Sequence, residues 1–436
     1  MRRRLLFTTA ALATAIAGLL GGVLVAKPDT VTASGVRPEA AAGRLLDGFA
    51  AGDTASYAAQ LEQRVEASPE DAEALMLLGL AYQQRARETG DPGFYPRSEE
   101  ALRRSLELVP ENDLAVTGLA ALAASRHRFD EARRLARRAL DLNPSSAAAL
   151  GILGDANVET GRYRAAFAAF DRMAAIKPSA AAYARVSYAR ELLGRSGGAT
   201  AAMRLAVSAA AGSAEPAAWS RTQLGNLHAQ GGRLGAAGRE YERALDHLPE
   251  YAPALAGLAT LELWRGRPAD AARLFDRALA GQPLPEFAIG LGDALAQAGQ
   301  AAAAERAYRR AEELEERFAE SGGRNDLETA LFDLDHDRDV GDALVRAREG
   351  RALRPSVEGE HVVAWALFKN GRCREARAHS VRALRLGTKD WGAMLHRSLI
   401  ESCLGNPDAA RLWRERALAA NRYALASFGP LAAHRR

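Results

Sequence analysis

Asp333 to Leu344 reads DLDHDRDVGDAL, a stretch in which acidic side chains alternate with other residues and a histidine lies among them. Alternating carboxylates are typical of a calcium-binding loop, which also needs glycine at its sixth position and a bidentate glutamate at its twelfth. Counted from Asp333, Arg338 holds the sixth position and Leu344 the twelfth, so both requirements fail. We therefore interpret the stretch as the end of one helix and the turn into the next, where Asp339 or Asp342 caps the second helix.

A second candidate site is GRSGG, Gly194 to Gly198, which matches the G-x-S-x-G pattern of serine hydrolases. That motif needs a strand before the serine, because the nucleophile lies on a strained elbow between strand and helix. Here the helical segment YARVSYARELL precedes it, so we do not expect Ser196 to be a nucleophile. The chain also lacks H-E-x-x-H, C-x-x-C and G-x-x-x-x-G-K motifs. We expect no enzymatic activity, no cofactor and no metal, with a weak divalent site at residues 333–339 as the alternative.

Prolines around these stretches recur at a spacing of 34 residues, which indicates a repeated structural unit. Pro110, Pro144 and Pro178 stand 34 residues apart, and so do Pro249 and Pro283. Alignment on these prolines brings two sets of glycines and one set of alanines into register. The sets are Gly161, Gly232, Gly266, Gly299, Gly371 and Gly405; Gly79, Gly154, Gly225 and Gly292; and Ala132, Ala166, Ala237, Ala271, Ala304, Ala343, Ala376 and Ala410.

Each of these residue types has a physical reason to recur. The first glycine set falls where a helix ends, and glycine adopts the left-handed conformation of such an end. The second set falls inside a helix, where glycine costs about 0.5–1 kcal/mol relative to alanine. A recurrent cost of this kind predicts that a neighbouring helix approaches closely, with the alanines on its facing side. The prolines disfavour helix in the residue before them and so end each second helix.

This pattern resembles the tetratricopeptide repeat, a helix–turn–helix of 34 residues. The resemblance implies an all-α fold, an α-solenoid of about ten helix–turn–helix repeats stacked side by side. The repeats are predicted to begin near residues 72, 113, 147, 180, 218, 252, 285, 324, 357 and 391.

Three segments depart from the regular repeat. TGDPGFY is an insertion of about seven residues between the helices of the first repeat. AAAGSAEPAAW adds four residues before a repeat resumes, and RRAEELEERFAESGGRN lacks the closing proline and is predicted to prolong a helix. The insertion, YARVSYARELLGR and LETALFDLDHDRD also resemble, as a set, a group of exported bacterial tetratricopeptide proteins.

The N-terminus has the layout of a secretory signal. Three arginines precede 22 uncharged residues, Leu5 to Ala26, which as an uncleaved helix are also long enough to cross a bilayer. We therefore expect the rest of the chain to lie outside the cytoplasmic membrane, either secreted or anchored. The predicted divisions are a signal peptide or anchor at 1–26, a linker at 27–42, N-terminal capping helices at 43–70 and the solenoid at 71–429.

The net charge argues against one class of function, and the two cysteines raise the question of a disulfide. The formal net charge is +4, of which the N-terminal arginine triplet supplies three, so the remainder is nearly neutral. A nucleic-acid-binding protein needs a concentrated basic face, and we expect none here. The two cysteines, Cys373 and Cys403, either pair or remain separate buried thiols. We favour separate thiols, because an exported domain of this length does not need a disulfide for stability.

The resemblance to tetratricopeptide proteins implies a concave groove lined by the first helix of each repeat. The family's basic clamp for a terminal carboxylate is matched at Asn226, but the clamp lysines are missing. Carried over by register, the groove candidates are Asp155, Glu159, Tyr188, Glu191, Trp219, Asn226, Gln230, Trp264, Asp293 and Gln297.

The leading hypothesis is a non-enzymatic scaffold of the bacterial cell envelope that binds a protein or peptide partner in this groove. A mixed polar and aromatic lining is typical of surfaces that bind peptides. The alternative is an accessory or substrate-holding subunit of an envelope polymer-synthesis or transport system, in which the array holds the substrate.

Overall fold

The computed structural model describes residues 42–43, 45 and 53–427. The leader predicted for 1–26, and all but the last residue of the predicted linker, lie outside the described residues. In the described part, regular structure is helical throughout and no strand occurs. None of the described helices combines the length and the apolar character that a membrane span requires.

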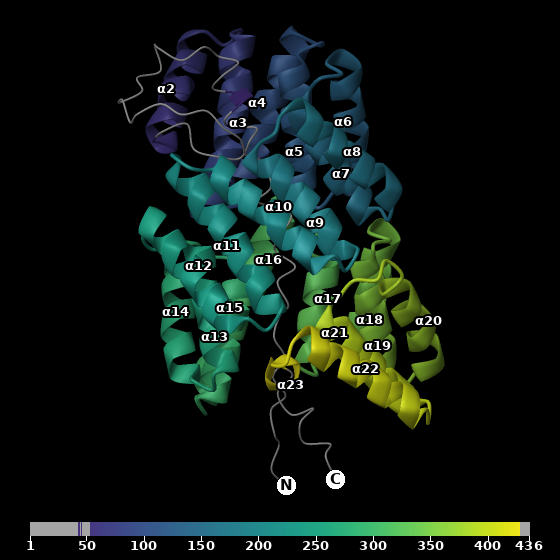
Figure 1. The fold of residues 1–436 in the computed structure, drawn as a ribbon. Helices are drawn as coiled ribbons and strands as arrows, with labels where there is room; N and C mark the ends of the chain where they lie inside the picture. Colours follow the sequence, from purple (N-terminus) through teal and green to yellow (C-terminus); the bar gives the residue numbers. More distant parts are fainter. Residues whose placement is uncertain (1–41, 44, 46–52, 428–436) are drawn as a thin grey trace.

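The described helices form ten antiparallel hairpins, preceded by α2 (Thr54–Ala67) and followed by the short α23 (Ala424–Ser427) (Figure 1). The hairpins pair α3 (Ala72–Thr89) with α4 (Phe94–Leu108), α5 (Asp113–Ser125) with α6 (Phe129–Leu142), α7 (Ala147–Glu159) with α8 (Tyr163–Ile176), α9 (Ala180–Leu192) with α10 (Ser196–Ala209), α11 (Ala214–Gln230) with α12 (Leu234–His247), α13 (Ala252–Trp264) with α14 (Pro268–Gly281), α15 (Pro285–Gln297) with α16 (Ala301–Glu320), α17 (Asp326–Asp335) with α18 (Val340–Leu353), α19 (Val357–Lys369) with α20 (Cys373–Ala383), and α21 (Trp391–Cys403) with α22 (Pro407–Ala420).

The predicted α-solenoid is therefore confirmed, and eight of its ten repeats begin at the predicted residue. The fifth begins at Ala214 instead of 218, because the four additional residues form an extra N-terminal turn of α11. The eighth begins at Asp326 instead of 324. The prolonged helix is also confirmed, since α16 runs for 20 residues.

Local signals set where the first helices begin and end. The side chains of Asp71, Ser146 and Asp390 cap α3, α7 and α21 by accepting a backbone N–H from the first turn. The hairpin turn then needs one residue with positive φ, and Gly161 supplies it at φ +71°. Local signals of this kind mark the ends of several repeats, which explains why many predicted boundaries agree with the structure.

Within a hairpin, an aromatic ring of the second helix lies against the bare backbone of the first. A Cβ atom added at Gly225 would lie 2.5 Å from Cε1 of Tyr241, and one added at Gly154 would lie 2.2 Å from Cε1 of Phe170. Tyr241 also reaches the next hairpin, because a Cβ at Gly257 would lie 2.6 Å from the same ring atom. One ring therefore holds together three helices from two repeats, which couples nearest neighbours along the array.

Gly225→Ala tests this contact. Alanine normally favours a helix over glycine, but here its methyl group overlaps the Tyr241 ring. We expect the free energy of unfolding, measured by urea denaturation, to fall by about 1–3 kcal/mol. Gly197→Ala in α10 is the matched control, because a Cβ there meets nothing within 4 Å. Equal stability of the two variants would contradict the contact.

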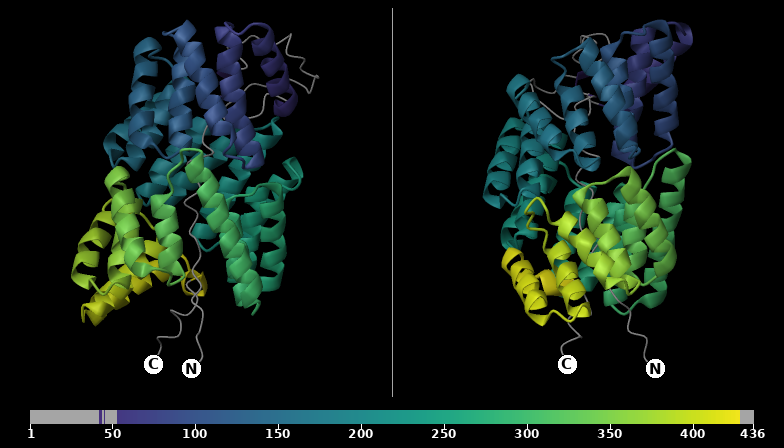
Figure 2. Two further views of the ribbon diagram at one scale, coloured as in Figure 1. Left: turned by 180° about the vertical axis from the view of Figure 1, so that it is seen from behind. Right: turned by 90° about the vertical axis from the view of Figure 1, so that its right-hand side faces the viewer.

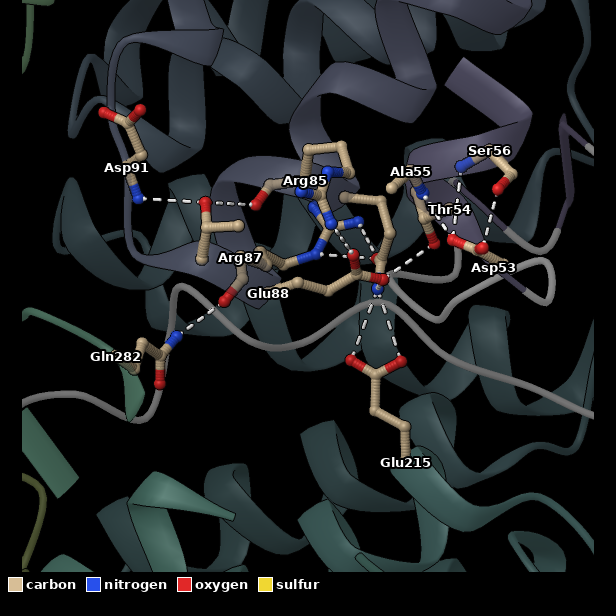
Figure 3. A network of polar contacts seen from close by, with 12 residues as sticks. Asp53, Thr54, Ala55, Ser56, Arg85, Arg87, Glu88, Asp91, Glu215 and Gln282 are labelled. Atoms are coloured by element: carbon tan, nitrogen blue, oxygen red, sulfur yellow. Dashed lines mark hydrogen bonds and ion pairs between the residues drawn. The ribbon is translucent and has the colours of Figure 1, made fainter. Parts of the chain in front are cut away.

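The array winds back upon itself, so that turns of the first five hairpins lie against loops of the second five (Figures 1 and 2). We call these contacts the seam. Hydrogen bonds of the seam include those from Gln282 Nε2 to Arg87 O at 2.5 Å (Figure 3), from Arg324 N to Arg126 O at 3.2 Å, from Val357 N to Tyr163 Oη at 2.6 Å, from Trp391 Nε1 to Gln230 Oε1 at 2.7 Å, and from Asn421 Nδ2 to Ala229 O at 3.3 Å.

The seam leaves no room for side chains at two of the turns. A Cβ at Gly161 would lie 2.5 Å from the carbonyl oxygen of Pro355, and one at Gly194 would lie 2.1 Å from that of Gly387. The equivalent Gly371 of a later hairpin has nothing within 4 Å. Glycine at the early turns therefore serves a second purpose beyond its positive φ, namely close approach of the opposite loop.

A buried ion cluster lies at the same part of the seam. The Arg354 guanidinium, whose side chain is 8% exposed, donates Nε to Glu159 at 3.0 Å and Nη1 to Glu328 at 2.6 Å. Its Nη2 lies 3.7 Å from Glu358. One cation thus joins the third and eighth hairpins and faces three carboxyl groups, of which Glu358 has a pKa raised to about 8 by burial.

Gly161→Ala and Gly371→Ala form a matched pair that tests the seam. Both positions have nearly the same positive φ, +71° and +72°, so both substitutions carry the same backbone strain. We expect Gly161→Ala to lower the free energy of unfolding by about 1–3 kcal/mol more, because its methyl group meets a carbonyl. Hydrogen exchange at the Val357 amide should accelerate in that variant alone. The seam is contradicted if both variants exchange alike.

The structure contradicts the prediction that the two cysteines are separate thiols. Cys373, at the start of α20, and Cys403, at the end of α21, form a disulfide, with their Cα atoms 6.2 Å apart. The interpretation as separate thiols is therefore wrong. Antiparallel neighbours bring the start of one helix beside the end of the next, so 30 residues of sequence separation become one contact in space.

Candidate functional site

Five of the ten predicted groove residues line a single hollow between α9 and α11. Tyr188 and Glu191 come from α9, and Trp219, Asn226 and Gln230 come from α11. The register prediction missed the other lining residues, which are Ala184, Ser187, Met203, Gln223 and Leu227. Gln223 lies three residues before Asn226 and so follows from helical spacing. Met203 comes from the second helix of its hairpin, where a prediction limited to first helices does not look.

Contacts behind the hollow hold its amides and its serine in place. Asn226 Oδ1 accepts a hydrogen bond from Tyr241 Oη at 2.8 Å, and Gln230 Oε1 accepts one from Trp391 Nε1 at 2.7 Å across the seam. Ser187 Oγ donates to the Ala199 carbonyl at 2.8 Å. The hollow is therefore shaped both by its own hairpins and by the return of the tenth hairpin.

Three polar groups of the hollow have no partner within the described part of the chain. They are the Tyr188 hydroxyl, the Glu191 carboxylate and the Trp219 indole N–H. Burial, with the charge of Asp390 nearby, raises the pKa of Glu191 to about 7. Burial also raises the pKa of Tyr188 well above its usual range, so this residue keeps its proton. The groups together offer two donors and one acceptor to a ligand.

Three of the other predicted groove residues have buried partners within the protein. Asp155 Oδ2 lies 2.7 Å from Arg185 Nη2, and burial raises the pKa of Asp155 to about 6. Glu159 pairs with Arg354 at the seam. Asp293 Oδ1 accepts from Tyr308 Oη at 2.9 Å and lies 2.8 Å from His336 Nε2.

Trp264 and Gln297 also lie apart from the hollow. The Trp264 ring, 8% exposed, packs edge-on against Trp391 with 6.1 Å between centroids, and Gln297 is exposed at the end of α15. The predicted set therefore contains one coherent group of five residues and five residues outside it. Whether any of the ten contacts a peptide stays a prediction.

The acidic stretch from Asp333 to Leu344 spans the end of α17 and the start of α18. Its carboxylates point to different partners: Asp333 pairs with Arg346, and Asp337 pairs with Lys369. Asp335 accepts a hydrogen bond from Trp365 Nε1 at 2.8 Å. Within residues 53–427, no group of three or more His, Cys, Asp or Glu side chains is placed to hold a metal ion.

The ends of the helices bear on two predictions: the cap of α18 and the role of Ser196. Asp339 occupies the N-cap position of α18, but its side chain makes no capping hydrogen bond, because its backbone has a positive φ of +33°. Asp342 lies in the first turn of that helix, where a negative charge is favourable. Ser196 is the first residue of α10 and follows helix α9, so the strand that a nucleophile elbow needs is absent in front of it.

The fold and the hollow define the class: paired helices stacked into an α-solenoid with a lined inner face. Two segments match family models described as tetratricopeptide repeat, over residues 117–181 and 228–288. The chain is therefore a tetratricopeptide-repeat protein. The similarity to exported bacterial members of that family stays a prediction, and no curated protein matches the chain.

Several solved structures are similar to the chain at low identity. The APC/C hetero-tetramer Cut9–Hcn1 shares 13% identity with a TM-score of 0.38, covering 85% of this chain and 92% of that chain. MamA shares 20% identity with a TM-score of 0.29, covering 37% and 93%. YrrB, described as a TPR protein with an unusual peptide-binding site, shares 21% identity with a TM-score of 0.28, covering 42% and 93%.

Stability should depend on pH because several half-buried carboxyls bind protons more tightly in the folded state. Burial raises the pKa of Glu191 to about 7, and those of Glu315 and Glu358 to about 8. The folded state therefore holds protons that the unfolded chain has released, so the free energy of unfolding falls as pH rises toward 8. Histidines with lowered pKa values act in the opposite direction below about pH 6.5, where the unfolded chain binds their protons.

We therefore expect the midpoint of urea denaturation to fall between about pH 6.5 and about pH 8. Replacing Glu315 and Glu358 together by Gln should flatten this decline, because two of the titrating groups are then absent. Glu375→Gln is the control, since Arg372 lowers the pKa of Glu375 and keeps its titration below this window. A midpoint that rises with pH in the wild-type chain would contradict the assignment of the raised carboxyls.

Proposed function

We propose that this protein is a non-enzymatic scaffold that binds a protein or peptide partner along the inner face of its first helices, outside the cytoplasmic membrane. The observation that carries the proposal is the hollow between α9 and α11. Tyr188, Glu191 and Trp219 there present a hydroxyl, a carboxylate and an indole N–H, none of them with a partner in the described part of the chain.

Polar groups that lack a hydrogen bond within the protein can form one with a ligand, and such a bond contributes about 0.5–1.5 kcal/mol. A peptide provides carbonyl oxygens, amide groups and side chains in one molecule. The lining is also rich in the amphipathic aromatic residues that carry binding energy at interfaces, here Tyr188 and Trp219. Arrays of stacked helical repeats offer such surfaces along their concave side.

The location outside the cytoplasmic membrane has two sources of support. The first is the arginine triplet followed by 22 uncharged residues, which has the layout of a secretory signal. The second is the disulfide between Cys373 and Cys403, because disulfides persist in oxidising compartments and are rare in the cytosol. Both features are expected of a protein that works in the cell envelope.

Site-specific photo-crosslinking in intact cells tests the proposal. A photoreactive phenylalanine analogue at Tyr188 should give a discrete adduct with another protein, recovered in the extracytoplasmic fraction. The same analogue at Leu205 is the matched control, because Leu205 belongs to the same hairpin but is 51% exposed on the second helix.

We expect adducts from position 188 and none of the same mass from position 205. Equal yields at both positions, or no adduct at 188, would contradict binding at the inner face. Adducts confined to the cytoplasmic fraction would contradict the location but leave the binding role intact.

A further inference from the structure

The hollow between α9 and α11 has a chemical composition that selects among peptide side chains. Of the ten described residues that line it, two are aromatic, three are primary amides and one is acidic; none is basic. Tyr188 and Glu191 lie three residues apart on α9, so they share a face of that helix. An anionic group entering the hollow would meet the Glu191 carboxylate with no cation in the lining to balance it.

The charged groups that act most strongly on Tyr188 and Glu191 are carboxyl groups. Asp390 acts on Glu191 from the start of α21. Glu159 and Glu358 act on Tyr188 from the seam. Arg354 is the cation nearest to that pair of glutamates, and it is already engaged by Glu159 and Glu328 at hydrogen-bond distance. Glu159 is paired with Arg354 and the pKa of Glu358 is raised to about 8, so the negative charge that a ligand would meet comes from Glu191 and Asp390, which favours a positive ligand.

The lining also has the surfaces that a desolvated cation needs. An ammonium or guanidinium group is attracted to the face of an aromatic ring, and the attraction increases when water is excluded. Trp219, 8% exposed, and the half-buried Tyr188 supply two such rings beside the carboxylate. Because Gln230 Oε1 is already bonded to Trp391, the remaining hydrogen-bonding capacity of that amide includes its two N–H donors, which suit a peptide carbonyl.

We propose that this hollow takes the positively charged side chain, lysine or arginine, of the bound peptide, with Glu191 as its counterion and Trp219 and Tyr188 against its apolar stem and charge. The inference rests on the proposed peptide-binding function and names the chemistry of the partner. It differs from the recognition of a terminal carboxylate by a basic clamp, for which the hollow has the opposite charge.

Support also comes from the state of Glu191 in the absence of a ligand. Burial and Asp390 raise its pKa to about 7, so its charged form is disfavoured in the empty hollow. A cation at hydrogen-bond distance stabilises the carboxylate. A bound cation would therefore form an ion pair with Glu191 and favour the charged form of its carboxyl group.

The experiment uses the purified full chain and four fluorescein-labelled, end-capped nonapeptides of alanine and serine that differ at the central residue. That residue is lysine, arginine, acetyl-lysine or glutamate, and binding is measured by fluorescence anisotropy. Acetyl-lysine keeps the length of lysine but removes its charge. We expect the lysine and arginine peptides to bind about tenfold more tightly than the acetyl-lysine peptide, and the glutamate peptide to bind most weakly.

Two variants localise the effect. Glu191→Gln keeps the shape of the side chain and should abolish the preference for lysine over acetyl-lysine while the acetyl-lysine peptide still binds. Glu375→Gln, on the exposed surface of α20, should leave the preference unchanged. Circular dichroism melting of both variants establishes that each is folded, so a lost preference reports on the hollow itself.

The possible outcomes distinguish failure of the cation pocket from failure of the proposed peptide binding. If the wild-type chain binds lysine and acetyl-lysine peptides equally, the cation pocket is refuted but the peptide-binding role stands. If Glu191→Gln retains the full preference, a different carboxylate is responsible and the assignment of this hollow fails. If none of the four peptides binds, both the cation pocket and peptide binding at this face are refuted.

Discussion

The contact between an aromatic ring and a bare glycine backbone is the interaction on which the architecture depends. The rings of Phe170 and Tyr241 lie against Gly154 and Gly225, so the two helices of the third and fifth hairpins approach more closely than a side chain on the first helix would allow. Tyr241 also touches Gly257 in the following hairpin. Each hairpin is rotated slightly relative to the one before it. These small rotations add up along the array, and their sum determines the path of the whole solenoid.

That path closes upon itself, which changes what the inner face is. In an open solenoid the first helices are available to solvent along their whole length. Here the second half of the chain returns to the first, and inner-face groups such as Gln230 and Glu159 bind Trp391 and Arg354 from the opposite half. The inner face is therefore divided into stretches that hold the molecule together and a hollow between α9 and α11, whose Tyr188, Glu191 and Trp219 have no hydrogen-bond partner among the described residues.

The sequence was sufficient for the elements and insufficient for the contacts between distant elements. Helix starts depend on capping residues and turns such as Asp71 and Gly161, which act over a few positions and repeat at a constant interval. The register of the first helices also predicted half of the hollow, because Asn226 and its neighbours share one helical face. The same register could not separate Asn226 from Asp155, whose buried partner Arg185 comes from the neighbouring repeat.

The seam also removes a freedom that repeat proteins usually have. An open array gains or loses one unit with little consequence, since each unit contacts only its neighbours. In this chain each early turn meets the loop that follows the hairpin five places later, as Gly161 meets Pro355 and Gly194 meets Gly387. Deleting one internal hairpin would present the wrong loop to every turn whose partner lies beyond the deletion. The contacts across the seam therefore fix the number of hairpins in this protein.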